Sequence, residues 1–306
     1  MGPRAIKNFS PTLKKFADSI KRVGLIANTE KPAGAPVIRQ AAALIERAGR
    51  EALAHDATAQ MAGLNVDSRE SRADVAKQCD VLLVFGGDGT MLGVTRALAG
   101  CRTPILAINL GSLGFLTAVP SDQIETALEL VWQGRFDIDS RHLIEAVVPD
   151  AGKNGAQHAL NDFVITRGAA SRMIELEVDV DDVALTTYRC DGLIVSSPTG
   201  STAYSLSAGG AIVSPSAEVF TITPICPHTL SNRSVLVSLS SAVRVKVMNR
   251  KPATIMASDG QVISDLSAGD EVVIRRSRRI VRLLRLEGTS FFKTLNQKLN
   301  WSGSNV

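Results

Sequence analysis

The 306-residue chain contains no apolar stretch long enough to cross a membrane. A spanning helix needs roughly 20 consecutive apolar residues, whereas the fully apolar runs here are short, as in Val81–Phe85. Residues 1–22 mix charged with apolar side chains and offer no continuous apolar segment of the kind found in secretory signals. We therefore expect a soluble protein that does not bind membranes.

Cysteine is scarce, and no two cysteines form a C-x-x-C pair. This spacing argues against a zinc site and against a disulfide framework. The expected location is therefore a reducing compartment, the cytoplasm. The cysteines are Cys79, Cys101, Cys190 and Cys226.

A strong excess of one charge is also absent, since 34 basic residues face 30 acidic ones and the formal net charge is +4. This balance argues against nucleic acid as the main partner, although a pI of about 9.0 leaves that alternative open. Between residues 274 and 286, arginines alternate with apolar residues, as in a strand with one solvent-exposed face. We interpret this cluster as a solvated or ion-paired surface and leave a specific role open. Its members are Arg275, Arg276, Arg278, Arg279, Arg282 and Arg285.

No internal repeat or low-complexity linker interrupts the chain, and 45% of its residues are hydrophobic. The composition excludes a disordered chain, and at roughly 100–200 residues per domain the length predicts two domains. In the first half, apolar strands alternate with helices, which is typical of a parallel sheet covered on both faces. The expected strands are Arg22–Asn28, Asp80–Phe85 and Pro104–Asn109. The expected helices are Pro36–Arg50, Met91–Leu98 and Ser121–Trp132, with Ser121 as the cap of the last.

The pattern changes near Ile138, where short strand-like segments separated by turn residues replace helical periodicity. This half is expected to be rich in β-structure, in the manner of a β-sandwich. An amphipathic helix is expected over Ser290–Trp301, because Phe291, Leu295 and Leu299 share one face. The expected strands are Leu143–Val148, Phe163–Thr166, Ile174–Val180, Leu193–Ser196, Val235–Leu239, Val243–Val247, Thr254–Ala257 and Glu271–Arg275.

Two expected strands of the first half end in glycine-rich loops, Gly86–Thr90 (GGDGT) and Asn109–Phe115 (NLGSLGF). Ligands of doubly wound sheets bind at the carboxyl ends of strands, and glycines let backbone N–H groups approach a phosphate. Neither loop is a Walker A sequence, and Leu92 stands where a G-x-G-x-x-G motif needs its third glycine. Protein-kinase signatures are absent as well. An ordinary P-loop NTPase and a standard Rossmann oxidoreductase are therefore disfavoured.

Asp88 is the unusual residue of the first loop, because negative charge beside phosphates is unfavourable. A carboxylate at this position suggests a chemical role, either accepting a proton from an attacking hydroxyl or helping to hold a metal that bridges phosphates. The structural alternative is a simple turn in which Asp88 bonds its own backbone. The full GGDGT motif at the end of a buried strand favours the chemical role.

A second polar segment lies in the β-rich half, over residues 191–210. It begins with Asp191 and contains a dense series of hydroxyl side chains around the motif TGSTAY, residues 199–204. Hydroxyls suit the many donors and acceptors of a ribose or nucleotide. The structural alternative is a polar junction in which Ser201 or Thr202 caps a helix.

Together these segments resemble the NAD kinase family. The resemblance rests on GGDGT, on Asn161-Asp162, on residues 191–210 with TGSTAY, and on residues 223–228 (TPICPH), in this order. It covers residues 23–289, most of the chain. GGDGT alone is shared with lipid kinases, whereas its combination with TGSTAY is highly specific.

The resemblance implies transfer of the terminal phosphoryl group of ATP to the 2′-hydroxyl of the adenosine ribose of NAD, giving NADP and ADP. A divalent metal such as Mg²⁺ is implied with ATP, without protein metal ligands. Asp88 takes the role of general base, and because aspartate is a weak base it orients the hydroxyl and receives the proton late. The residues implied against the phosphates of ATP are Gly86, Gly87, Gly89 and Thr90.

The resemblance also implies a set of NAD-binding residues. Asn161 and Asp162 match an Asn-acid pair that grips ribose or adenine, with Asp162 shorter than the frequent glutamate. An arginine two residues before the acid Asp191 resembles NAD-selective enzymes, so Arg189 predicts a preference for NAD over NADH. For Arg172 and Arg189 a surface ion pair remains the alternative. The full set is Asp88, Gly89, Phe115, Asn161, Asp162, Arg172, Arg189, Asp191, Thr199, Thr202, Ala203, Tyr204, Ser205, Leu206, Ser207 and Gln261.

We expect two domains, an α/β Rossmann-like domain over residues 1–137 and a β-rich domain over residues 138–288. The tail, residues 289–306, is expected to pack on the first domain. The family resemblance implies a homo-oligomer, a dimer or tetramer. Two alternatives stay open: a lipid or sphingoid-type kinase that shares GGDGT, and a non-catalytic dinucleotide sensor. His228 lies between prolines and is expected to shape a loop rather than to take part in catalysis.

Overall fold

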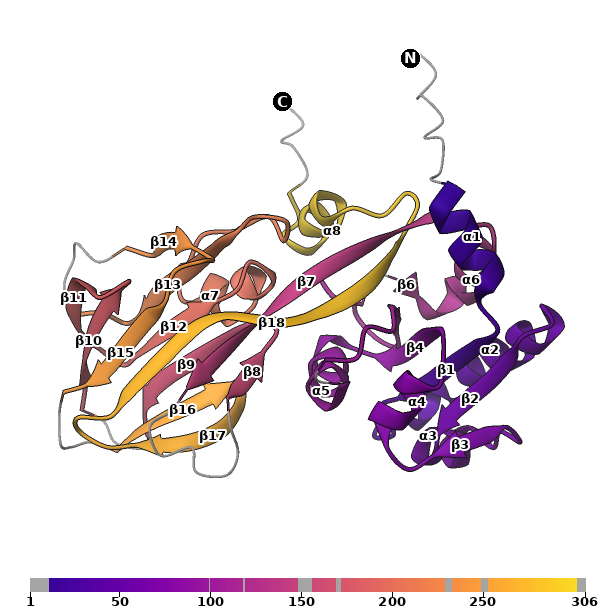
Figure 1. Ribbon diagram of the computed structural model, residues 1–306, viewed down its shortest axis with the longest axis horizontal. Helices are drawn as coiled ribbons and strands as arrows, with labels where there is room; N and C mark the ends of the chain where they lie inside the picture. Colours follow the sequence, from indigo (N-terminus) through magenta and orange to yellow (C-terminus); the bar gives the residue numbers. More distant parts are fainter. Residues whose placement is uncertain are drawn as a thin grey trace, which may run out of the picture. The chain divides into compact units, whose positions relative to one another are not determined.

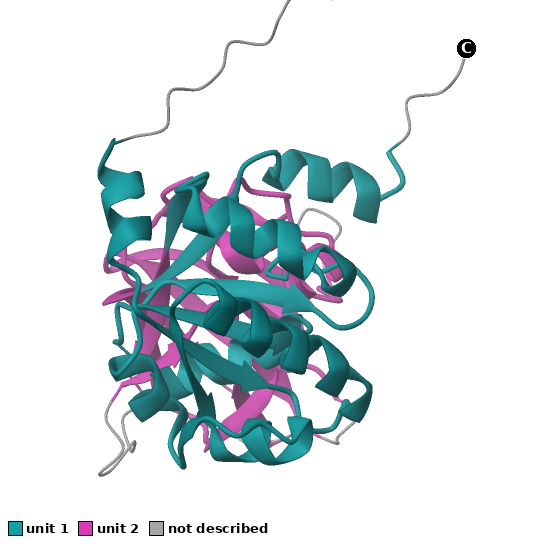
Figure 2. Cartoon of the chain, turned by 90° about the vertical axis from the view of Figure 1, so that its right-hand side faces the viewer, with its two compact units in different colours: residues 1–140, 281–306 teal, residues 141–280 magenta. Residues whose placement is uncertain are grey.

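The computed structural model describes residues 11–98, 100–117, 119–147, 156–168, 172–228, 233–248 and 253–301. The chain divides into two compact units, the first made of residues 1–140 and 281–306 and the second of residues 141–280 (Figure 2). The chain passes from the first unit to the second within strand β7 (Phe136–Val147) and returns within strand β18 (Glu271–Leu286).

The first unit contains a parallel sheet in the order β3-β2-β1-β4-β5. Strands β3, β2, β1 and β4 are labelled in Figure 1. Leu82, Leu83 and Val84 of β4 are all fully buried, and since neighbouring side chains point to opposite faces, both faces of the sheet are covered. Near its end β18 runs parallel to β5, with Leu283 opposite Ile105. The strand bounds are β1 Arg22–Ala27, β2 Glu51–His55, β3 Asp67–Arg69, β4 Val81–Gly86, β5 Ile105–Asn109 and the short β6 Val119–Pro120.

Helices cover this sheet because their apolar faces supply the rest of the core. Ile38, Ala41 and Ile45 of helix α2 are buried at helical spacing, and α2 lies beside α3 and α6 whereas α4 lies beside α5. The helices are α1 Pro11–Ser19, α2 Ala35–Arg47, α3 Asp56–Ala62, α4 Arg72–Lys77, α5 Asp88–Leu98, α6 Ile124–Trp132 and α8 Phe291–Lys298. Two 3₁₀ turns, η1 Pro32–Gly34 and η2 Ser121–Gln123, precede α2 and α6.

The second unit contains two antiparallel sheets. One runs β11-β10-β15 and continues into the first residues of β18, and the other runs β14-β13-β12-β9-β16-β17. The bounds are β8 Gln157–Ala159, which pairs with β7, β9 Asp162–Arg167, β10 Ile174–Val180, β11 Val183–Cys190, β12 Gly192–Ser196, β13 Val219–Ile225, β14 Val235–Ser238, β15 Val243–Val247, β16 Thr254–Ser258 and β17 Gln261–Leu266. The 3₁₀ turn η4 Thr199–Thr202 and helix α7 Tyr204–Ser207 follow β12.

One apolar core joins the two sheets of the second unit. Ile174, Leu176 and Val178 alternate with more exposed residues along β10, and they share a cluster with Phe163 of β9 and Phe220 of β13. Alternation of buried and exposed residues is what a sheet with one covered face requires. The predicted fold class, an α/β part followed by a strand-rich part, is confirmed.

Several predicted elements differ in detail. Ser121 does not cap α6, because it lies inside the 3₁₀ turn η2 and no side chain caps the helix. Strand β11 was not predicted, because most of its residues are exposed and show no apolar alternation. Strand β18 was predicted as a short strand but contains 16 residues. The predicted C-terminal helix is present, and Ser290 caps it by accepting a hydrogen bond from the N–H of Lys293.

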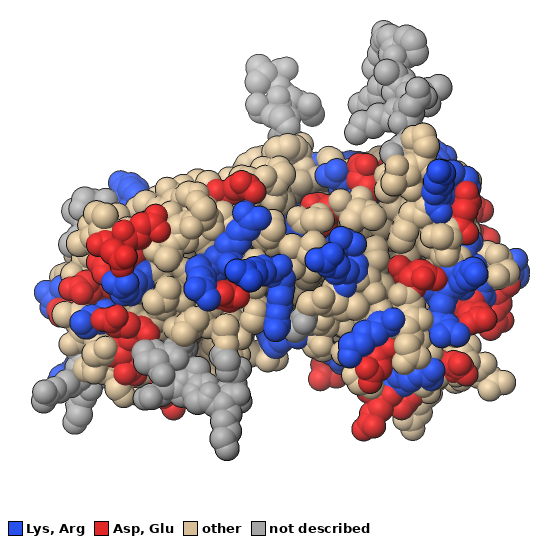
Figure 3. Space-filling view, in the orientation of Figure 1, with Lys and Arg blue, Asp and Glu red and all other residues tan. Residues whose placement is uncertain are grey.

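The arginine cluster of β18 is ion-paired at three positions. Arg275 pairs with Glu145 at 2.8 Å, Arg276 with Glu218 at 3.6 Å, and Arg285 with Asp137 at 3.3 Å. These three arginines are exposed, and Figure 3 shows that basic and acidic side chains are both present on the face it draws. The interpretation as an ion-paired surface is confirmed for these three arginines.

Candidate functional site

The GGDGT loop lies where the strand order of the first unit reverses. The chain adds β2 and β3 on one side of β1, and then crosses over and adds β4 and β5 on the other side. The topological switch point of the sheet therefore lies between β1 and β4. Ligands of such sheets bind at the carboxyl ends of the strands beside this switch point. β4 ends at Gly86, and helix α5 begins at Asp88. The short Gly87 connection therefore places the first turn of α5 at the position where a ligand is expected.

The glycines of this loop differ in what surrounds them. At Gly87 and Gly89 no atom lies within 4 Å of the position that a Cβ would take, whereas at Gly86 a Cβ would collide with the side chain of Thr90. The N–H groups of Asp88 and Gly89 belong to the first turn of α5, where a helix has no internal acceptors. Open space beside unpaired N–H groups at a helix N-terminus suits a phosphate.

The Asp88 carboxylate is held by a different loop of the chain. Its Oδ2 accepts a hydrogen bond from the N–H of Phe115 at 2.9 Å, and its Oδ1 accepts from the N–H of Leu116 and from the N–H and hydroxyl of Thr117, each at 3.1 Å. At Gly114 a Cβ would collide with the same carboxylate. The alternative in which Asp88 bonds only its own turn is therefore wrong: this side chain joins both glycine-rich loops.

Phe115 links this arrangement to the C-terminal helix. Its ring lies 6.2 Å from the ring of Phe291, centroid to centroid, and the Lys298 ammonium lies 5.5 Å from the centroid of the Phe115 ring. Both Phe291 and Lys298 belong to α8. The residue that donates to Asp88 Oδ2 is thus packed against the tail of the chain.

In the second unit, Asn161 and Asp162 lie at the start of β9, against a hairpin turn. The Asp259 carboxylate accepts hydrogen bonds from the N–H groups of Leu160, Asn161 and Asp162 at 3.0, 2.8 and 3.3 Å. Asp162 is buried, with 4% of its surface exposed. Burial raises its pKa to about 7, and the negative charge of Asp259 adds to this rise.

The TGSTAY segment packs directly against this pair. The N–H of Ser197 donates to the carbonyl oxygen of Asn161 at 2.8 Å, the Ser197 hydroxyl donates to the carbonyl of Leu160 at 2.6 Å, and Gly200 lies so close to Asn161 that a Cβ would collide with its backbone. Tyr204 is 46% exposed, whereas Ser205 is buried. The structure therefore brings Asn161 and Asp162 together with residues 199–207.

The segment is a polar junction between a strand, a turn and a helix, as the structural alternative expected, but neither Ser201 nor Thr202 caps the helix. Residues 199–202 form a 3₁₀ turn, and Ala203 occupies the N-cap position of α7. The Ser201 hydroxyl is buried and bonds instead to Pro198 and Val213. The hydroxyls of this segment thus hold the turn itself.

Two arginines of the second unit, Arg167 and Arg189, form ion pairs. Arg189 pairs with Glu175, on the neighbouring strand, at 3.0 Å, and its side chain is 62% exposed. Arg167, which the sequence did not single out, pairs with Asp191 at 2.8 Å. Arg172 and Gln261 are exposed. A surface ion pair, the alternative considered for Arg189, is therefore its state in this structure.

Both parts of the chain match one enzyme family. Residues 23–136 match the ATP-NAD kinase N-terminal domain, and residues 160–286 match the ATP-NAD kinase C-terminal domain. The chain is 40% identical over 283 residues to the NAD kinase of Syntrophotalea carbinolica, an alignment that covers 92% of this chain and 99% of that protein. The chain belongs to the NAD kinase family.

Two solved structures share the fold of this NAD kinase family member. The yeast NADH kinase complexed with NADH gives a TM-score of 0.85 at 25% identity, covering 93% of this chain and 89% of that one. An NAD kinase from Archaeoglobus fulgidus in complex with ATP gives a TM-score of 0.74 at 24% identity, covering 92% of this chain and 100% of that one. The predicted family and class of enzyme are confirmed: the chain is a phosphotransferase that phosphorylates NAD. A lipid kinase and a non-catalytic sensor are the wrong alternatives.

The residues predicted for NAD kinase chemistry are distributed over both units. Residues 86–90 and Phe115 belong to the first unit, and the other predicted residues, from Asn161 to Gln261, belong to the second. His228 also lies in the second unit. It is exposed, and its backbone N–H donates a hydrogen bond to the carbonyl oxygen of Arg189 at 2.9 Å.

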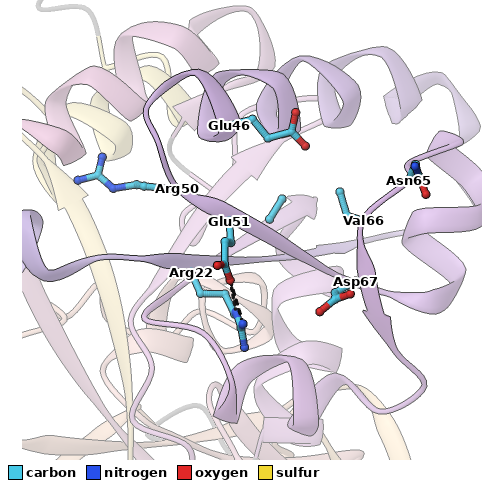
Figure 4. Close-up of a pocket in the computed structure, with 8 residues that line it drawn as sticks. Arg22, Glu46, Arg50, Glu51, Asn65, Val66 and Asp67 are labelled. Atoms are coloured by element: carbon cyan, nitrogen blue, oxygen red, sulfur yellow. Dashed lines mark hydrogen bonds and ion pairs between the residues drawn. The ribbon is translucent and has the colours of Figure 1, made fainter.

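A pocket of about 270 Å³ in the first unit lies away from the NAD kinase motifs (Figure 4). Arg22, Glu51 and Asp67 line it, and these residues begin β1, β2 and β3, so it lies at the edge of the sheet opposite to Gly86. Arg22 is paired with Glu51 at 2.8 Å. Because Glu51 neutralises Arg22 and Asp67 adds a negative charge to the lining, this pocket does not suit an anionic nucleotide.

Within the described ranges, no group of three or more His, Cys, Asp or Glu side chains could hold a metal ion. No described helix is long and apolar enough to span a membrane.

Proposed function

We propose that this member of the NAD kinase family transfers the terminal phosphoryl group of ATP to the 2′-hydroxyl of the adenosine ribose of NAD, giving NADP and ADP. The observation that carries the proposal is the Asp88 carboxylate, held by four hydrogen bonds from residues 115–117 at the switch point of the first unit. A carboxylate fixed next to a phosphate-binding helix terminus is what transfer to a hydroxyl requires.

Asp88 would act as the general base through Oδ2. Three of the four hydrogen bonds go to Oδ1 and one goes to Oδ2, and a carboxylate oxygen can accept about two. Oδ2 therefore keeps acceptor capacity for the ribose hydroxyl. As the bond from the hydroxyl oxygen to the terminal phosphorus forms, the bond from that phosphorus to the bridging oxygen of ADP breaks. The hydroxyl proton passes to Asp88 late in the step.

The donor phosphates would lie against Gly86, Gly87, Gly89 and Thr90. The open space at Gly87 and Gly89 and the N-terminus of α5 support this placement. When bound with ATP, Mg²⁺ would neutralise charge developing on the phosphates. Magnesium commonly takes one or two carboxylates and several phosphate oxygens as ligands, so a site with a single carboxylate fits an ion that phosphates mostly hold.

Each unit contains residues that are proposed as contacts for NAD. We propose Asp88, Gly89 and Phe115 from the first, and from the second the two groups that pack together, Asn161-Asp162 and Thr199–Ser207. Arg172, Arg189, Asp191 and Gln261 complete the proposed set. The contacts of Ser197 and Gly200 with Asn161 support a common binding surface in the second unit.

We also propose domains of residues 1–137 and 138–288, a homo-oligomer and a cytoplasmic location. The cysteines Cys79, Cys101, Cys190 and Cys226 are all free, which agrees with a reducing compartment.

A coupled assay tests the proposed reaction. Purified protein is incubated with NAD, ATP and Mg²⁺, and NADP is followed with an NADP-specific dehydrogenase. We expect NADP that depends on all three components. A panel of other triphosphates and inorganic polyphosphate identifies the donor, and absence of NADP with every donor would contradict the proposal.

A further inference from the structure

The hairpin turn between β16 and β17 is bonded to the Asn161-Asp162 pair in both directions. The Asp259 carboxylate accepts from the N–H groups of Leu160, Asn161 and Asp162. In return, the N–H of Asp259 donates to the carbonyl oxygen of Asp162 at 3.1 Å. Four hydrogen bonds from one residue thus fix three consecutive residues of the proposed NAD-binding surface.

The turn restricts which residue can do this. Asp259 and Gly260 both have positive φ angles, 46° and 78°, as a two-residue hairpin turn of the Asp-Gly type requires. Aspartate and asparagine tolerate this conformation better than most residues with a side chain. Asparagine at position 259 would therefore preserve the turn and remove the negative charge, which makes the two contributions separable.

The surroundings of the two carboxyl groups differ strongly. The Asp259 carboxylate accepts hydrogen bonds from three backbone N–H groups. Asp162 is buried, and the charged group that acts on it is Asp259. Serines lie on the two strands that pair with β9. On β12, Ser196 is opposite Asp162 in the strand register, and its hydroxyl donates to backbone carbonyls. On β16, the Ser258 hydroxyl donates to the carbonyl of His158. The imidazole of His158 lies against Glu145, at 3.5 Å.

We infer that Asp259 is a positioning residue for NAD: its four hydrogen bonds hold the backbone of residues 160–162, and its carboxylate acts together with burial to favour a neutral Asp162 carboxyl when the ligand binds. This inference rests on the proposed function. A neutral carboxyl can donate one hydrogen bond to a sugar hydroxyl and accept another. It also adds no negative charge to a surface that binds a dinucleotide with two phosphates, whereas an ionised Asp162 would repel that ligand.

The pH dependence of NAD affinity tests the inference. The pKa of Asp162 is raised to about 7, so its neutral form dominates at pH 6 and is lost by pH 8. If NAD binds the neutral form, the KM for NAD and its Kd by calorimetry both rise about tenfold between pH 6 and pH 8. Asp162→Asn keeps a neutral donor at every pH, and its NAD affinity becomes independent of pH in this range.

Asp259→Asn separates charge from turn geometry. Removing the neighbouring charge lets the pKa of Asp162 fall. The affinity for NAD is then lost at a lower pH than in the wild type, so at pH 7.5 the variant has the higher KM for NAD. Asp181→Asn is the matched control: Asp181 also has a positive φ, 51°, in a hairpin turn, and its carboxylate accepts the N–H of Ala242 at 2.8 Å. We expect the control to keep the wild-type pH profile.

Two results would overturn the inference. One is an NAD affinity of the wild type that does not change between pH 6 and pH 8; the other is a shifted profile in Asp181→Asn that equals the shift in Asp259→Asn. If Asp259→Asn proves unstable by its Tm, the comparison of wild type with Asp162→Asn decides. Calorimetry measures NAD binding without turnover, so a failure of the reaction and a failure of this inference are distinguishable.

Discussion

Gly114 lies directly against Asp88, because a Cβ at position 114 would collide with the Asp88 carboxylate and with the Thr117 side chain. We therefore expect Gly114→Ala to displace Asp88. A displacement of about 1 Å at a reacting group costs about 100-fold in rate. The assay of NADP formation should show kcat reduced to that extent, with a smaller change in the KM for NAD.

The same loop offers a control for that substitution. At Gly111 the nearest atom to a Cβ would be the Lys31 ammonium nitrogen, at 3.5 Å, which is an ordinary contact. We expect Gly111→Ala to retain near wild-type kcat. Equal losses in Gly111→Ala and Gly114→Ala, at unchanged Tm, would contradict the role of the contact with Asp88.

Asp88→Asn tests the proposed base itself. The amide cannot accept a proton from the ribose hydroxyl, and general-base catalysis contributes about 100- to 10,000-fold. We expect kcat to fall by at least about 100-fold, while calorimetry shows NAD binding largely retained. Wild-type turnover in this variant would remove Asp88 from its role.

Arg189 is expected to influence the choice between NAD and NADH. The wild type should use NAD with a kcat/KM at least about tenfold above that for NADH. Arg189→Ala should narrow this difference. Because the guanidinium and the oxidised ring are both cationic, they do not attract each other, so Arg189 would act through Asp191, through a phosphate or through the shape of the site. Glu175→Gln, which removes the ion-pair partner and keeps the arginine, serves as control. Comparable efficiency of the wild type on both substrates would refute the prediction.

The C-terminal helix is expected to support Phe115. Phe291→Ala removes the ring that packs against Phe115, and aromatic pairs contribute about 0.5–1.5 kcal/mol beyond their buried area. We expect a lower Tm and a several-fold loss of kcat/KM for NAD. Phe292→Ala is the control, since Phe292 is 64% exposed. Identical kinetics in the wild type and Phe291→Ala would show that this packing does not matter for the site.

Local patterns predicted the position of the main motif but not its contacts. The apolar run before Gly86 predicted that GGDGT follows a buried parallel strand, and β4 does end at Gly86. The bonds from Asp88 to Phe115 and Thr117 connect residues 27 and 29 positions apart, and no periodicity reports such a pairing. The arrangement depends on how β4 and β5 pair side by side, which is a tertiary property.

Asp259 illustrates a second limit of prediction from sequence. An Asp-Gly pair predicts a turn, and the turn is present. Its carboxylate, however, bonds residues 97 to 99 positions earlier in the chain. Arg167 was missed for the same reason: its partner Asp191 directly precedes β12, the strand adjacent to β9, and the sequence did not show the register of these strands.

The passage of β18 from one unit to the other has a consequence for synthesis of the protein. Residues 141–280 form one continuous stretch of chain, so the second unit can fold as soon as that stretch has left the ribosome. The first unit is interrupted: Leu283, which pairs with Ile105, is made more than a hundred residues after the other parallel strands. Until then the edge of β5 beside Ile105 is open, since β6 pairs only with Ile108 and Asn109, and an open edge of an apolar strand favours aggregation. The unit that begins the chain is therefore the last to be completed.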